Sequence, residues 1–138
     1  MTPKESGAIQ KAAARCTTIM FNFEKLDTWQ EAIAFGQLVY AATRGFPSEE
    51  RFGLCSQMRR AAVSVSFNIA EGSARVSRPE FARFVEISTG SLFEVVSQAV
   101  LSQREDFLTP EHYHMLYGSA EQLGKMLSGL RRSLVDNR

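Results

Sequence analysis

The sequence is poor in cysteine, in long apolar runs and in net charge, and each of these absences excludes a class of protein. Its two cysteines, Cys16 and Cys55, lie far apart and have neither CxxC spacing nor a partnering histidine, so they predict reduced thiols in a cytoplasmic protein. No run approaches the roughly 18 to 20 apolar residues that a membrane span requires. The N-terminus also has no apolar stretch typical of a signal peptide. The sequence therefore predicts neither secretion nor a membrane partner.

The charges are balanced overall but unevenly distributed. Sixteen lysines and arginines against 15 acids leave a net charge of +1, which is not typical of a strongly basic nucleic-acid-binding protein. Residues 45–84, however, hold six arginines against the four acids Glu49, Glu50, Glu71 and Glu80. A local basic patch near the middle of the chain therefore stays open.

The N-terminal 20 residues differ from the rest of the chain. Residues 1–20 are rich in alanine and have little amphipathic pattern, so we expect a frayed or weakly helical extension. Regular patterning begins just after Met20, which is itself a candidate start of the protein. The remaining residues, 21–138, are long enough for one domain with a single buried core.

Apolar periodicity predicts four helices, over residues 28–44, 49–71, 78–105 and 110–135. Ser48 is the predicted N-cap of the second helix, and Gly72 is predicted to stop it. Ser77 and Glu80 form a capping box for the third helix, and Thr109 precedes Pro110 at the start of the fourth. Short connections between four helices predict an all-α fold, an up-down-up-down antiparallel four-helix bundle.

The first and fourth helices each show one apolar stripe. In the first helix, Trp29, Ile33, Gly36 and Tyr40 recur at helical spacing, which predicts that Trp29 and Tyr40 lie in the core. In the fourth helix, a regular seam of apolar residues runs from Tyr113 to Leu134, and the opposite face is polar. We therefore expect water on the outer face of the fourth helix.

The second and third helices are apolar on more than one face. In the second, Met58, Val65 and Ile69 share a face, whereas Phe67 points the other way. In the third, an equally broad apolar arc includes Phe93, Val96 and Val100. One small bundle cannot cover both faces, so the sequence predicts a homo-oligomer with these candidate contacts: Phe67, Phe93, Val96 and Val100.

No residue pattern predicts catalysis. Glu111 and His114 form one Glu-x-x-His pair, but a metal site in a bundle core needs a second copy and further carboxylates, so we expect no metal and no other cofactor. No serine or cysteine has the context of a nucleophile, and no glycine-rich phosphate loop is present. Gly90, in the middle of the third helix, instead predicts close approach of two helices. We expect neither enzyme activity nor a small-molecule substrate.

Five arginines are candidate nucleic-acid-binding residues: Arg59, Arg60, Arg75, Arg78 and Arg83. Around a corner between two helices, their side chains could grip phosphates as bidentate donors. In the alternative interpretation, Arg59 and Arg60 pair with acids such as Glu94 or Glu71, within the bundle or across the oligomer contact, and the others lie in water. Aromatic residues do not interleave with these arginines in the sequence, which favours the alternative.

Three segments carry a resemblance to a known family: FEKLDTWQEA at residues 23–32, QMRRAAVSVSFNIAEGSAR at 57–75 and EFARFVEISTGSLFEV at 80–95. With them, the sequence over residues 23–134 resembles the four-helix proteins of the 23S rRNA intervening-sequence family, to which the accessory proteins of diversity-generating retroelements are related. The resemblance implies a homopentameric ring of four-helix protomers. It also implies nucleic-acid binding, which is proposed for the retroelement branch.

The sequence is compatible with two functions. The first is a non-catalytic, oligomeric scaffold that binds RNA or DNA, and the second is a protein-protein interaction module with no nucleic-acid role.

Overall fold

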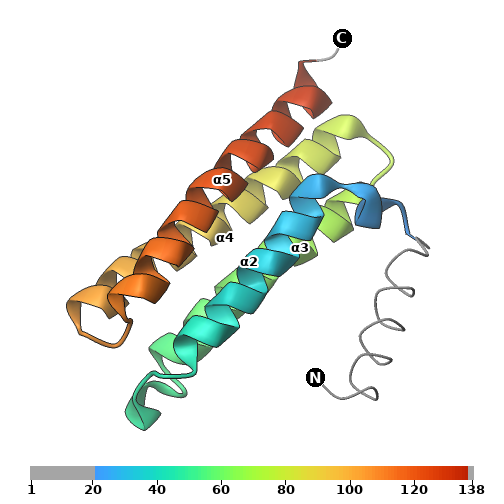
Figure 1. Cartoon of the computed structure of the whole chain (residues 1–138). Coiled ribbons are helices and arrows are strands. Elements are labelled where there is room, and N and C mark those ends of the chain that lie inside the picture. The colour runs from blue at the N-terminus through green and yellow to red at the C-terminus, as the bar shows by residue number, and fades with distance from the viewer. Residues whose placement is uncertain (1–20, 137–138) are drawn as a thin grey trace, which may run out of the picture.

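The computed structural model describes residues 21–136, and the predicted N-terminal extension, residues 1–20, lies outside them. The elements in chain order are η1 (Asn22–Lys25), α2 (Asp27–Thr43), η2 (Ser48–Glu50), α3 (Leu54–Ser73), α4 (Arg78–Arg104) and α5 (Pro110–Val135). Each long helix packs against its neighbours in the chain, and α2 also packs against α5 (Figure 1). The predicted all-α four-helix bundle is confirmed, with no strand in the part of the chain described.

Three of the four predicted helices begin and end within a residue of their expected bounds. Two predicted N-caps are confirmed, since the Ser77 hydroxyl accepts a hydrogen bond from the Glu80 N–H at 3.2 Å and the Thr109 hydroxyl from the His112 N–H at 3.1 Å. These side chains satisfy N–H groups that have no partner inside the helix.

The second predicted helix begins later than expected. Ser48 does not cap it, because residues 48–50 form the short 3-10 helix η2 and α3 begins only at Leu54. The reason is Gly53, whose ψ of −113° lies outside the helical region and separates the two elements. Gly53 stands at the N-cap of α3 without a side-chain hydrogen bond.

The core runs along the inner faces of all four long helices. Fully buried side chains include Phe35 on α2, Met58 on α3, Leu92 on α4 and Leu123 on α5. The predicted apolar seam of α5 is confirmed in its middle part, where these residues are buried: Leu116, Ala120, Leu123 and Leu127.

The predicted apolar stripe of the first helix is wrong by one residue. The core side chains of α2 are Ala32, Phe35 and Val39, whereas Ile33 and Tyr40 are 37% and 39% exposed. Each predicted residue follows a true core residue, so the helix is rotated by about 100° from the expected orientation. Tyr40 therefore lies at the surface, while Trp29 is half-buried and packs edge-on against Phe23.

Gly72 lies inside α3 and does not stop it. A Cβ atom at this position would meet the Cβ of Phe84 at 2.7 Å and the Cδ1 of Phe81 at 2.8 Å, so α3 and α4 come unusually close here. Gly90 does not have the predicted role, because a Cβ there would meet nothing within 4 Å. The glycine that permits close helix approach in the protomer is Gly72.

We predict that Gly72→Ala destabilises the protein, although alanine is the better helix former. Because Phe84 contacts this site through its Cβ, the backbone of α4 must shift, at a cost of about 1 to 3 kcal/mol. Urea unfolding followed by circular dichroism measures the effect. Gly118→Ala on α5 is the matched control, since nothing lies within 4 Å there and the change should be neutral or stabilising. Equal midpoints for the two variants would contradict the close packing.

Candidate nucleic-acid interface

Most arginines of the structure have no acidic partner. Of the ten arginines in residues 21–136, Arg131 alone forms an ion pair, with its Nε 2.7 Å from Oε1 of Glu86. The expected pairs of Arg59 and Arg60 with Glu94 or Glu71 do not form within the protomer. Positive charge on the described surface is therefore largely uncompensated by direct contact.

The five candidate arginines divide into two groups at opposite ends of the bundle. Arg59 and Arg60 lie in the first half of α3, whereas Arg75, Arg78 and Arg83 surround the turn between α3 and α4. Arg59 is fourteen residues before Ser73, the last residue of α3, or roughly 21 Å along the axis, and Arg75 lies beyond that end. We call the second group the α3–α4 cluster. One protomer thus presents two separate basic sites.

The fold adds two arginines to the first group that the sequence did not single out. Arg44 follows the last residue of α2 and Arg51 follows η2, and both line a hollow with Arg59. Together with Arg60 they form the group that we call the α2–α3 cluster. The sequence does contain a signal for this turn, since Arg51 is followed directly by an aromatic residue and a glycine.

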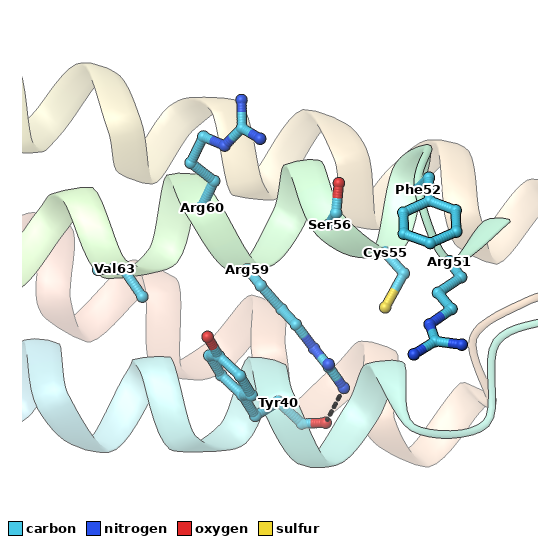
Figure 2. A pocket seen from close by; sticks show the side chains of 8 residues that line it. All are labelled: Tyr40, Arg51, Phe52, Cys55, Ser56, Arg59, Arg60 and Val63. Carbon is cyan, nitrogen blue, oxygen red and sulfur yellow. Dashed lines mark hydrogen bonds between the residues drawn. The ribbon is translucent and has the colours of Figure 1, made fainter.

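Arg59 is held by neutral acceptors on α2. Its Nε donates to the Thr43 hydroxyl at 2.9 Å, its Nη2 donates to the Tyr40 carbonyl oxygen at 3.4 Å, and its guanidinium lies 4.6 Å from the Tyr40 ring centroid (Figure 2). These contacts fix the position of the side chain without cancelling its charge. Arg59 therefore joins α2 to α3 and remains a cation at the surface.

The side chains around Arg59 line a groove of about 450 Å³ between α2 and α3. In Figure 2, Arg51 and Arg59 extend toward the end of α2, while Arg60 points away from it. Phe52 is 87% exposed, and the Arg51 guanidinium lies 5.5 Å from its ring centroid. The groove is thus lined by three arginines and two accessible aromatic rings.

The α3–α4 cluster is also held mainly by neutral groups. The guanidinium of Arg75 lies 4.6 Å from the Phe84 ring centroid, and Arg78 Nη2 donates to the Ser133 carbonyl oxygen at 2.5 Å. Arg83 is exposed and lines a shallow hollow with Glu86. Aromatic rings that are separated from the arginines in sequence are therefore brought against them by the fold.

The candidate oligomer contacts do not form one patch. Phe67 and Phe93 are 65% and 64% exposed, but Val96 packs against the core of its own protomer and Val100 is half-buried. Phe67 is nine residues from the buried Met58, which places it on the opposite side of α3. Phe93 instead lines a groove between α4 and α5. Of the four candidates, two aromatic side chains are therefore exposed, and they lie at separate positions.

The Glu-x-x-His pair does not belong to a larger group of ligands. Glu111 and His114 are exposed on the first turn of α5, and within residues 21–136 no three His, Cys, Asp or Glu side chains come together as a metal site would need. Of the described helices, α4 alone is long and apolar enough for a membrane span, and in the bundle it packs between α3 and α5.

A known protein family covers most of the four-helix bundle. Residues 24–129 match the family model described as 23S rRNA-intervening sequence protein. The chain belongs to this family. The match spans all of α2, α3 and α4 and most of α5, so both arginine clusters lie inside the family region.

A solved structure has the same fold as this family member. It is a crystal structure from Bacteroides thetaiotaomicron, described as a protein with unknown function from the S23 ribosomal protein family. The two chains are 20% identical, the match covers 76% of this chain and 95% of the other, and the TM-score is 0.70. A search among curated proteins found no match. The relation to retroelement accessory proteins stays a prediction.

Proposed function

We propose that this protein is a non-catalytic, self-associating helical scaffold that binds RNA or DNA through the phosphate backbone. The proposal rests on the contacts of the arginines in the two clusters. Their guanidinium groups contact hydroxyl, carbonyl and aromatic groups or are exposed, and none forms an ion pair within the described residues. Guanidinium groups with neutral partners keep their full charge for phosphate oxygens and can donate to them bidentately.

Self-association supplies the affinity that one protomer lacks. The net charge of +1 provides little long-range attraction to nucleic acid. Linking several weak sites in one particle raises the apparent affinity by about 10² to 10⁴ without any new contact. The family resemblance predicts a homopentameric ring, and the exposed Phe67 and Phe93 are the side chains that we propose lie in contacts between protomers.

A second candidate function is a protein-protein interaction module with no nucleic-acid role. The balanced net charge and the large exposed aromatic side chains favour it. We further propose that the protein works in the cytoplasm without cofactor, small-molecule substrate or membrane partner, in keeping with the free, buried Cys55.

We predict that the protein binds mixed RNA and DNA at about 50 mM salt and loses affinity steeply toward 200 mM. Replacing the α3–α4 cluster with alanines, at Arg75, Arg78 and Arg83, should lower the slope of log affinity against log salt by about 0.9 per lost duplex phosphate contact. Fluorescence anisotropy measures both quantities. Lys125→Ala on α5 is the control and should leave the slope almost unchanged. No binding even at the lowest salt would leave the interaction module as the function.

We predict that Phe67→Glu dissociates the assembly and leaves the protomer folded. The side chain is 65% exposed, so a charge here meets water in the monomer and is buried only in a contact between copies. Light scattering at micromolar concentration should show a drop to monomer mass, with an unchanged circular dichroism spectrum. Met115→Glu, also exposed, is placed outside the proposed contact and should keep the wild-type mass. A wild-type protein of monomer mass would refute self-association.

A further inference from the structure

Two joined hollows at the α2–α3 end suit the two halves of a nucleotide. The larger, about 450 Å³, is lined by Tyr40 and Phe52, and the smaller, about 270 Å³, is lined by Arg44 and Ser48. Both hollows share the same three side chains between them: Arg51, Cys55 and Arg59. An aromatic hollow thus adjoins a cationic one.

The larger hollow offers aromatic surface to a flat apolar group. Phe52 is 87% exposed on the turn before α3, and Tyr40 is 39% exposed on α2. An aromatic ring so exposed contributes little to the fold of the protomer, but it can stack on a nucleobase for about 1 to 3 kcal/mol. In Figure 2 the Phe52 ring lies at the start of α3, and the Tyr40 ring lies farther along the groove, on α2.

The smaller hollow concentrates positive charge. Three arginines line it, and no aspartate or glutamate lines either hollow. The nearest acids of the turn are Glu49 and Glu50, and the Glu50 carboxylate lies over the Cα of Gly53, 3.3 Å from where a Cβ would stand. Because Arg59 is already fixed by Thr43, less conformational entropy is lost when it binds an anion.

We infer that this groove binds one unpaired nucleotide of a single-stranded nucleic acid, with the base against Phe52 and the phosphate among Arg44, Arg51 and Arg59. This inference rests on the proposed function and adds a preference for single strands. A base inside a duplex has both faces covered by its neighbours, so it cannot stack on a protein ring. Only an unpaired base reaches the larger hollow.

The test compares a short single-stranded RNA, the same sequence as single-stranded DNA, and its duplex, each carrying 2-aminopurine. Stacking of this fluorescent base on a ring quenches its emission, and anisotropy gives the affinity in parallel. We expect quenching with both single strands and none with the duplex. A difference between RNA and DNA shows whether the 2′-hydroxyl is read.

Phe52→Ala should lower the affinity for single strands by about 5- to 100-fold, restore the fluorescence, and leave duplex affinity unchanged. Phe21→Ala, at a ring that is 59% exposed and lies before η1, near the other end of α2, is the control and should change none of these quantities. Arg51→Ala should lower the affinity for all three ligands. It should also lower the slope of log affinity against log salt, by about 0.7 for a single strand.

The outcomes separate this inference from the proposed function. Equal affinity of Phe52→Ala and wild type for single strands, or an equal loss for strand and duplex, would overturn the inference while salt-dependent binding still stands. Failure of the wild-type protein to bind any of the three ligands at low salt would overturn both.

Discussion

The arrangement of the whole bundle depends on the close packing of α3 against α4. At one end of this interface Gly72 leaves room for Phe84, and near its middle the Ser88 hydroxyl donates to the Val65 carbonyl oxygen at 2.8 Å. The hydroxyls of Ser64 and Ser91 lie 2.9 Å apart beside them. Small side chains with satisfied hydrogen bonds allow the two backbones to approach, and any larger side chain would push them apart. This contact therefore fixes the rotation of α3 about its own axis.

Once the rotation of α3 is fixed, the direction of each of its surface residues follows from the helical step. Arg59 meets α2, and Arg60 and Phe67, seven residues apart, point outward on nearly the same face. The Thr43 hydroxyl, buried and already donating to the Val39 carbonyl oxygen at 2.8 Å, accepts from Arg59. A cation that is hydrogen-bonded to a neutral partner keeps the positive electrostatic potential around it, whereas a carboxylate partner would cancel most of that potential. The packing of the core thus places uncompensated charge at one end of the protein.

The sequence predicts the helices well because the spacing of apolar residues and the capping residues both depend only on positions close together in the chain. Ser77 and Thr109 cap as expected, and the seam of α5 reads directly from its leucines. Prediction fails where two local solutions compete. On α2 the stripe through Ile33 and Tyr40 and the true one through Phe35 and Val39 differ by one residue, and only packing against α3 and α5 decides between them. The arginines were recognisable as basic, but their contacts with Tyr40 and Phe84 join residues far apart in the chain. No local pattern contains such pairs.

Hydrogen-deuterium exchange with and without a short single-stranded RNA tests the central claim most directly, since it locates binding without altering any side chain. The amides of residues 45–53, between α2 and α3, lie in a turn beside Arg44, Arg51 and Phe52 and should exchange readily in the free protein. We expect that saturating RNA slows exchange in this segment and leaves exchange in residues 110–125 of α5 unchanged. Unchanged exchange in residues 45–53 with RNA fully bound would contradict it.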